Sequence, residues 1–391
     1  MSDYPSDWEI TNLGTYLKET KERVHEGTAT PYSVSKVLGI VPQSEKFKKR
    51  VASNDISNYK IIRKGDFAYD PMLLWDGSIN RMLREDTGAV SPAYVTFRVL
   101  DNSLDANYLL HFLKADTAKN FYKSISKGTN VRRQKAEFRD FASGEFAIPP
   151  LPEQKKIAEI LSGIDNQIHS TQEQIDSLAI LGSAILEQSL NRLSDCPVRP
   201  LHDITTRITV GIVSKPADHY VTKGITTLRS MNIKEGRIDY KDLRFIAEES
   251  NRFFSKSIIH KGDILTVRTG APGTSAVATK DLEGANCVDI IVSSPVQGID
   301  SFFLCLQINS DRIKSKVFAG QGGLAQQHFN VGAMRDLELV IPPLAVQEEI
   351  SSSAVSVLQC IDAKKRHKKK LEGIKSAISA DLLSGRKRVS I

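Results

Sequence analysis

The sequence predicts an α+β protein with two similar domains, each built on a twisted, mostly antiparallel sheet, and two long helices that form an antiparallel coiled coil. A stretch that begins Ile-Pro-Pro-Leu occurs twice, at residues 148–157 and 341–350, about 193 residues apart. Each copy opens a long apolar pattern with heptad spacing. Each follows a segment of roughly 150 residues in which short β-rich stretches alternate with turn residues. These observations indicate a duplicated unit, in which a globular part is followed by a helical rod.

The apolar pattern of each rod defines the predicted contact between the two helices. Steps of three and four residues alternate along the first rod and skip Thr171 and Gly182. Three lysines, Lys364, Lys368 and Lys375, interrupt the second rod, so its seam is weaker there unless the amines snorkel out. The predicted seam positions are Ile157, Leu161, Ile164, Ile168, Ile175, Leu178 and Ile185 in the first rod and Ile350, Ala354, Val357, Ile361, Leu371, Ile378 and Leu382 in the second.

The Pro-Pro pair sets where each rod begins. Proline has no amide donor and cannot lie inside a helix, but Pro152 is tolerated in the first turn, where Glu153 complements the helix dipole. Forty helical residues at about 1.5 Å each make a rod of about 60 Å. One long core helix per domain is the alternative; the length, the heptad phase and the duplication favour paired rods that hold two domains apart. The predicted boundaries are 1–147 for the first domain, 148–193 for the first rod, 194–340 for the second domain and 341–391 for the second rod with its basic tail.

Turn and strand signals recur in the two globular parts. Between Tyr59 and Pro71 the pattern predicts a strand, a Lys-Gly-Asp turn and a second strand, and the same pattern returns between residues 258 and 267. β-Branched and aromatic residues predict further strands at 93–99 and 287–292. An amphipathic helix is expected near residues 107–119 and another near 302–317.

Composition narrows the class of protein. The chain has 391 residues, with 40% hydrophobic and 25% charged residues, which is ordinary for a globular protein with two cores. A net charge of +7 weakly favours a polyanionic partner. The four cysteines are far apart and lack metal-ligand spacing, so we expect neither a disulfide framework nor a metal site, and a reducing cytoplasmic location is the simplest. No apolar run approaches the length of a membrane span, so no membrane partner is expected.

The duplicated Ile-Pro-Pro-Leu-x-x-Gln rods, each following a domain with a Lys-Gly-Asp turn, resemble the specificity subunit of a Type I restriction-modification system. The resemblance spans essentially the whole chain. It implies that the rods form an antiparallel coiled coil, that each target-recognition domain reads one half of a split double-stranded DNA sequence, and that modification subunits, in two copies, dock alongside to methylate adenine. Restriction subunits complete the complex. One departure is Ala345-Val346, which stands where the first copy has Pro152-Glu153.

The resemblance places no cofactor on this chain, because S-adenosylmethionine, ATP and magnesium are expected on the partner subunits. Catalytic motifs are also missing from the sequence. It contains neither a Gly-x-x-x-x-Gly-Lys-Ser/Thr phosphate loop nor an Asp/Asn-Pro-Pro-aromatic methyltransferase motif, and its eight histidines are scattered. A non-catalytic DNA-reading subunit with a bipartite, asymmetric target is therefore the leading hypothesis. A coiled-coil scaffold that binds no DNA is the alternative, and the absent motifs disfavour a self-sufficient methyltransferase or nuclease.

Candidate DNA contacts come from basic and amide side chains near turns. Arginine pairs with guanine, glutamine and asparagine pair with adenine, and lysine meets phosphates. Each of these side chains has a solvated surface role as its alternative, as does the basic run at residues 364–370 of the second rod. The candidates are Lys46, Lys48, Lys49, Arg50, Arg81, Arg84, Arg132 and Arg133 in the first domain and Arg229, Asn232, Arg268, Thr269, Gln321, Gln326 and Gln327 in the second.

Overall fold

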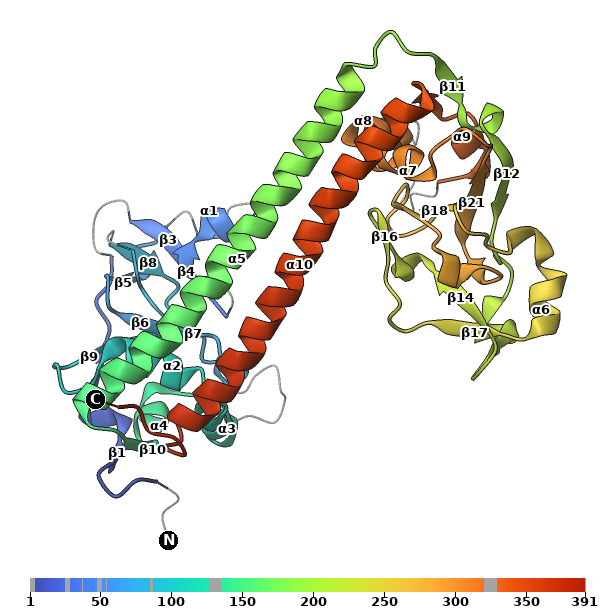
Figure 1. Ribbon diagram of the computed structural model, residues 1–391. Coiled ribbons are helices and arrows are strands. Elements are labelled where there is room, and N and C mark those ends of the chain that lie inside the picture. The colour runs from blue at the N-terminus through green and yellow to red at the C-terminus, as the bar shows by residue number, and fades with distance from the viewer. Residues whose placement is uncertain are drawn as a thin grey trace. The chain divides into compact units, whose positions relative to one another are not determined.

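The structure is a computed structural model and describes residues 4–24, 29–36, 38–47, 51–53, 55–84, 87–126, 135–319 and 329–390. The chain forms two compact units (Figure 1). Unit 1 contains residues 1–172 and 366–391, and unit 2 contains residues 173–365. The long helices α5 (Leu151–Asn191) and α10 (Leu344–Leu382) are divided between them, so each unit holds the first part of one helix and the last part of the other.

Unit 1 contains two four-stranded sheets. The first has the strand order β2-β9-β6-β7 and the second β4-β3-β8-β5, while β1 pairs with β10. Among the described strands of this unit, only β3 and β8 run parallel. The strands are β1 (Glu9–Asn12), β2 (Leu17–Thr20), β3 (Thr30–Ser35), β4 (Gly39–Pro42), β5 (Lys60–Ile62), β6 (Phe67–Tyr69), β7 (Ile79–Arg81), β8 (Gly88–Val90), β9 (Val95–Val99) and β10 (Glu145–Ile148). The helices besides α5 and α10 are α1 (Gln43–Lys46), α2 (Ala106–Leu113), α3 (Asp116–Ile125) and α4 (Phe138–Ala142), with 3-10 turns at Leu13–Thr15 and Leu74–Asp76.

Unit 2 repeats this plan. Its first sheet has the order β12-β21-β18-β19 and its second β13-β17-β14-β20, with β11 paired to β22 and β15 to β16. Its parallel pair, among the described strands, is β14 with β20. The strands are β11 (Val198–Pro200), β12 (Thr205–Val210), β13 (Tyr220–Val221), β14 (Ile225–Arg229), β15 (Ile233–Lys234), β16 (Arg237–Ile238), β17 (Arg244–Ile246), β18 (Ile264–Val267), β19 (Ser275–Val277), β20 (Asn286–Val288), β21 (Ile290–Pro295) and β22 (Glu338–Val340). The helices are α6 (Glu248–Phe253), α7 (Ser301–Asn309), α8 (Asp311–Ala319) and α9 (Val331–Arg335), with 3-10 turns at Leu201–Asp203, Pro216–His219, Ser230–Asn232, Ser255–Ser257 and Lys280–Leu282.

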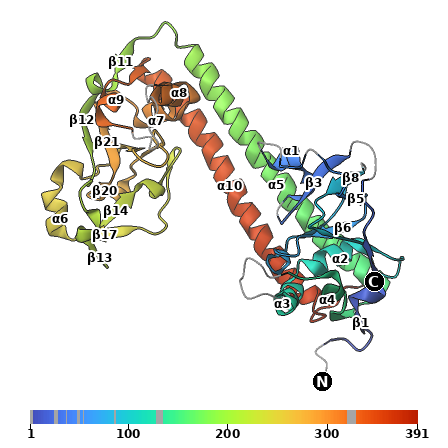
Figure 2. The ribbon, with the colours of Figure 1, turned by 180° about the vertical axis from the view of Figure 1, so that it is seen from behind.

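A separate apolar core lies in each unit, between the first sheet and the long helices. In unit 1 the stacked rings of Phe67 and Phe97 belong to a core that also receives Leu161 of α5 and Leu382 at the end of α10. In unit 2 the corresponding core includes Leu190 at the end of α5. Figures 1 and 2 show α2, α3 and α4 gathered around the long helices in unit 1, and α7 and α8 beside them in unit 2. The predicted α+β class, with mostly antiparallel sheets and two long helices that pack together, is confirmed.

The long helices run antiparallel within each unit. In unit 1 the amine of Lys375 contacts Asp165 at 2.5 Å, and the amine of Lys368 donates to Gln172 at 2.7 Å. Residue numbers therefore increase along α5 in the direction in which they decrease along α10. In unit 2 the Cα of Gly182 lies against Val357. The lysines that interrupt the apolar pattern therefore place their amines on polar groups of the facing helix.

The predicted seam positions differ in burial along the two helices. Ile185 is exposed at 38%, and Thr171, which the apolar pattern skips, is buried and donates its hydroxyl to the carbonyl of Gln167. Two positions are fully buried, Ile157 and Leu161, and three more are buried with 6–8% of their surface exposed: Ile175, Ile361 and Leu382. The others are half-buried: Ile164, Ile168, Leu178, Ile350, Ala354, Val357, Leu371 and Ile378.

Three predictions of local structure were wrong in detail. Each predicted domain helix is in fact two helices: α2 ends at Leu113 before α3, and α7 ends at Asn309 before α8. The strand expected at residues 287–292 is divided into β20 and β21, because Asp289 between them has a left-handed φ of 51°. These breaks depend on how the flanking segments pack, which the local pattern does not encode.

The Lys-Gly-Asp turns also differ from the expected strand pairs. In unit 1 the flanking strands β5 and β6 exist but belong to different sheets, so the turn carries the chain from one sheet to the other. In unit 2 a strand follows the turn, β18, while the preceding residues Ile258–His260 form none.

None of the helices in the described part of the chain is both long enough and apolar enough to cross a membrane.

Candidate nucleic-acid interface and its anchors

The glutamine of the repeated Ile-Pro-Pro-Leu motif anchors a long helix to a globular part in both units. In unit 1 the side chain of Gln154 accepts a hydrogen bond from the amide of Asp105 at 2.7 Å and donates to the carbonyl of Pro149 at 2.9 Å. In unit 2 Gln347 accepts from the amide of Asp300 at 2.9 Å and donates to the carbonyl of Pro342 at 2.8 Å. Both glutamines are buried.

The two aspartates that meet these glutamines are the N-caps of the domain helices α2 and α7. Asp105 accepts from the amides of Asn107 and Tyr108, and Asp300 accepts from the amide of Phe303. One buried amide side chain therefore ties the first turn of a long helix to the first turn of a domain helix. This contact explains why the motif needs glutamine at that spacing after the two prolines.

The residue before this glutamine differs between the copies, and so does its environment. Glu153 is fully buried and accepts from the indole of Trp8 at 3.1 Å and from the guanidinium of Arg388 at 2.6 and 2.8 Å. Arg388 also binds both oxygens of Asp7, which holds the pKa of Asp7 below its usual value and raises the pKa of the guanidinium. Val346 stands in this place in unit 2 and packs against the apolar core. The departure from the first copy thus exchanges an ionic anchor for an apolar one.

The Lys-Gly-Asp turn has the same backbone geometry in both units. Gly65 and Gly262 have left-handed φ values of 92° and 90°, which glycine adopts without strain. The following aspartate is buried and caps the turn: Asp66 accepts from the amide of Arg63 at 3.0 Å, and Asp263 accepts from the amide of His260 at 2.8 Å. The turn is therefore a rigid element next to the N-terminus of the domain helix.

Each buried aspartate pairs with an arginine, but the arginine comes from a different strand. In unit 1 Arg98 on β9 lies 3.2 Å from Asp66. In unit 2 Arg207 on β12 lies 2.6 Å from Asp263, and Ser294 occupies the place on β21 that faces it. The sequence alone did not predict this aspartate–arginine pair. The two residues are far apart in the chain, and the arginine lies on a different strand in each unit.

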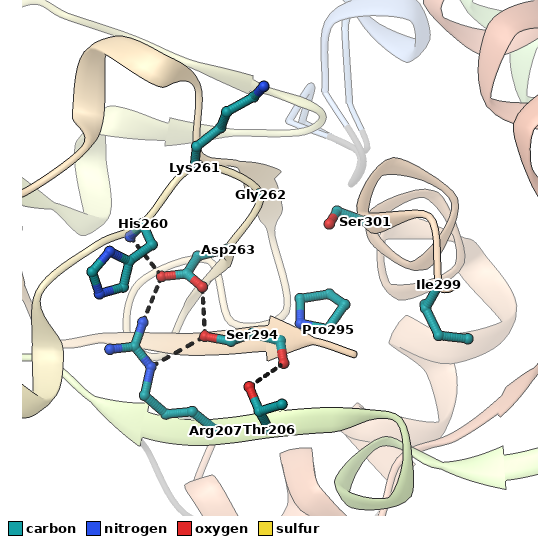
Figure 3. A pocket seen from close by; sticks show the side chains of 10 residues that line it. All are labelled: Thr206, Arg207, His260, Lys261, Gly262, Asp263, Ser294, Pro295, Ile299 and Ser301. Atoms are coloured by element: carbon teal, nitrogen blue, oxygen red, sulfur yellow. Dashed lines mark hydrogen bonds and ion pairs between the residues drawn. The ribbon is translucent and has the colours of Figure 1, made fainter. Parts of the chain in front are cut away.

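An open polar groove of about 450 Å³ lies beside the turn of unit 2 (Figure 3). Arg207 and Ser294 converge on Asp263 at its floor, where the Ser294 hydroxyl donates to the carboxylate at 2.5 Å. The side chain of Lys261 extends away from this cluster, while Ser301 of α7 forms part of the opposite wall. The lining residues are Thr206, Arg207, His260, Lys261, Gly262, Asp263, Ser294, Pro295, Ile299 and Ser301.

The predicted DNA contacts of unit 1 are only partly described. Arg84 forms an ion pair with Glu45 of α1 at 2.7 Å, and the amine of Lys46, the next residue of that helix, donates to the carbonyl of Val34 at 3.2 Å. Arg81 is apart from them and donates to Asn107 on α2. The remaining candidates of this unit lie outside the described residues: Lys48, Lys49, Arg50, Arg132 and Arg133.

Two predicted arginines of unit 2 are held by aspartates with left-handed backbones. Arg229 donates to the carbonyl of Asp242 at 2.6 Å, and Arg268 lies 3.1 Å from the carboxylate of Asp289. Asp242 and Asp289 have φ values of 50° and 51°, a strained conformation for residues other than glycine. The hydroxyl of Ser230, next to Arg229, lies 3.5 Å from the carbonyl of Asp289. Arg229 ends β14 of the second sheet, whereas Arg268 follows β18 of the first sheet.

The other candidates of unit 2 are Asn232, Thr269 and three glutamines. Asn232 is buried, accepts from the amide of Arg229 and donates to the carbonyls of Asp239 and Lys241. Its amide therefore makes its hydrogen bonds within the local turn, and a contact with adenine would require these bonds to break. Thr269 follows Arg268 and is half-buried. Gln321, Gln326 and Gln327 lie outside the described residues.

Comparison with known proteins identifies the family. Residues 43–179 and 214–373 match the model of the family described as the Type I restriction modification DNA specificity domain, and the chain belongs to this family. The MjaVIII specificity subunit of Methanocaldococcus jannaschii is 25% identical, over 98% of this chain and 94% of that protein. The putative MjaX specificity subunit of the same organism is 22% identical, over 100% and 96%. A crystal structure of the S subunit from M. genitalium shares the fold with a TM-score of 0.59 at 14% identity and covers 100% of both chains.

Proposed function

We propose that this chain is the target-reading subunit of a Type I restriction-modification complex and that it reads a split, asymmetric sequence in double-stranded DNA. Each unit reads one half of the target. Partner modification subunits, two per complex, use S-adenosylmethionine to methylate adenine, and restriction subunits cleave DNA with ATP and magnesium. This chain carries recognition and no catalysis, and the complex works in the cytoplasm.

The observation that carries the proposal is that the two units share one fold but differ in their second sheets, which we take to be the surfaces that contact DNA. Both units have the same first sheet and the same glutamine anchor, while their second sheets differ in strand order. Two homologous domains with different surfaces are suited to two different short sequences. Arg229 at the end of β14 and Arg268 directly after β18 are our candidates for base contacts in unit 2, because arginine pairs with guanine in the major groove.

The test is to co-purify this chain with the modification subunit from its own genome and to sequence the methylated adenines that the pair leaves on plasmid DNA. We expect a split, asymmetric motif that appears only when both chains are present. Methylation that does not depend on this chain would favour the coiled-coil scaffold, which also predicts no salt-dependent DNA binding.

A second experiment tests the division of labour between the units. We expect that exchanging residues 1–147 for the matching segment of a relative changes one half of the methylated motif and leaves the other half intact. A change in both halves would show that the two units do not read independently.

A further inference from the structure

One half-buried cation in unit 1 lacks the counter-charge that its neighbours have. Arg81 is the last residue of β7, the edge strand of the first sheet. Its Nη1 donates to the side chain of Asn107 at 2.9 Å, and its guanidinium lies 6.0 Å from the ring centre of Phe67. Within the described residues it forms no ion pair, and its buried Nε has no hydrogen-bond partner. Burial lowers the pKa of this guanidinium, although Asp105 opposes the effect.

The other arginines around the Lys-Gly-Asp turn of unit 1 are neutralised. Arg63 binds both oxygens of Glu22 at 2.6 Å, Arg84 pairs with Glu45, and Arg98 pairs with Asp66. Burying a charged group is unfavourable unless it is paired and hydrogen-bonded. Arg81 therefore has an energetic deficit in the free protein that an incoming anion relieves.

We propose that Arg81 binds a phosphate of the DNA backbone when unit 1 engages its half of the target, an inference that rests on the proposed function. The guanidinium is held against its own domain by Asn107 and Phe67, and its Nη2 lies beside Gly65 of the Lys-Gly-Asp turn. A side chain fixed in this way does not reach a base edge at the floor of a major groove about 8.5 Å deep. It reaches the outermost groups of the duplex, which are the phosphates.

The proposed contact between an arginine at this position and a DNA phosphate belongs to unit 1 alone. Phe67 pairs with Arg81 across β6 and β7, and Ile264 pairs with Val277 across β18 and β19. Phe67 and Ile264 both follow the aspartate of the Lys-Gly-Asp turn, so Val277 is the unit 2 counterpart of Arg81. Unit 2 therefore offers no cation at this position.

The experiment measures binding of the full-length chain, with its modification subunit, to labelled duplex DNA of mixed sequence across a series of salt concentrations. We expect Arg81→Met to weaken binding on every sequence and to reduce the slope of log K against log salt by about 0.9, the value for one lost phosphate contact. Arg81→Lys keeps the charge, so its slope stays near that of the wild type. Arg63→Met is the matched control, because it removes the same charge beside the same turn, and we expect it to leave the slope unchanged.

Thermal unfolding of the same variants separates a binding role from a structural one. Methionine keeps the contact with Phe67 and removes the unpaired charge, so we expect the unfolding temperature of Arg81→Met to equal or exceed that of the wild type. An unchanged salt slope, a loss confined to one base position, or a lowered unfolding temperature would each overturn the proposal. Absence of DNA binding by the wild-type complex would instead refute the proposed function, and it would be seen before any variant is compared.

Discussion

Unit 1 and unit 2 have the same strand order in their first sheets. In their second sheets three strands correspond, but the fourth strand is added at one edge in unit 1 and at the opposite edge in unit 2. The antiparallel neighbour and the parallel pair correspond, with β4-β3-β8 in unit 1 matching β17-β14-β20 in unit 2. The extra strand β5 lies beside β8, but β13 lies beside β17. The part of each unit that holds the long helices is thus preserved, and the part beyond it has diverged, as expected if the first part positions a reader and the second part reads.

The long helices show a second difference between the units. In unit 1 the contact includes two polar pairs, Asp165 with Lys375 and Gln172 with Lys368, in addition to the apolar core that Leu161 and Leu382 share. In unit 2 the two helices approach closely at Gly182 and Val357, beside a cleft of about 320 Å³ that both apolar and polar side chains line. Polar pairs on a helix seam specify register more than they add stability. The duplicated helices therefore meet through added polar pairs in unit 1 and through a close approach at a glycine in unit 2.

The largest expected effect comes from the buried aspartate of the Lys-Gly-Asp turn. We expect Asp263→Ala to destabilise unit 2 by about 3–5 kcal/mol, because it leaves Arg207 partly buried without a carboxylate. We expect a smaller loss in unit 1 from Asp66→Ala, because the side chain of Arg98 is 44% exposed and that of Arg207 only 25%. Hydrogen exchange followed by mass spectrometry reports each unit separately. Equal losses of stability in the two units would show that it does not matter which strand supplies the arginine.

The next comparison tests whether the glutamine anchors are equivalent. Gln154→Ala and Gln347→Ala each leave an N-cap amide and a proline carbonyl without a partner, which at about 1–3 kcal/mol per group destabilises the affected unit by roughly 2–6 kcal/mol. Hydrogen exchange at the first turns of α2 and α7 measures the loss. Lys155→Ala and Glu348→Ala change exposed neighbours of the glutamines and serve as controls. A marked loss in one unit only would mean that the other is held by its apolar contacts.

The smallest effect is a pH dependence that belongs to unit 1. Burial lowers the pKa of His111 to about 4; Lys375 and Lys114 act in the same direction and Asp165 opposes them. In the unfolded chain His111 takes up a proton near pH 6.5, whereas in the folded protein it does so only near pH 4. The stability that the neutral, buried imidazole contributes is therefore complete above pH 6.5 and is lost as the pH falls toward 4. Between pH 7 and pH 5 this amounts to about 2 kcal/mol.

Replacing the histidine tests this pH dependence. Leu306 stands six residues after the N-cap in α7, as His111 does in α2. We expect His111→Leu to remove the loss of stability between pH 7 and pH 5 in unit 1. Both tryptophans, Trp8 and Trp75, lie in unit 1, so denaturant unfolding monitored by tryptophan fluorescence reports this unit alone. If the variant kept the full pH dependence, another group would be responsible.

Local patterns in the sequence determined the elements whose cause is local. The Pro-Pro pair and the heptad spacing predicted α5 and α10, because the start of a helix and its periodicity depend on residues close in the chain. The repeat predicted two related units and, through its resemblance, the family that the comparisons confirm. Arg229 and Arg268 were predicted as loop arginines near turn signals, and the structure places Arg229 at the end of β14 and Arg268 directly after β18.

The tertiary structure decided everything that depends on distant partners. Whether Asn232 faces a base or its own turn depends on the carbonyls of Asp239 and Lys241, which only the folded turn brings to it. The exchange of the paired arginine between β9 and β12 follows from strand pairing, which has no local signature. The lack of a counter-charge at Arg81 is likewise a property of its surroundings, since the sequence shows an arginine but not which carboxylates reach it.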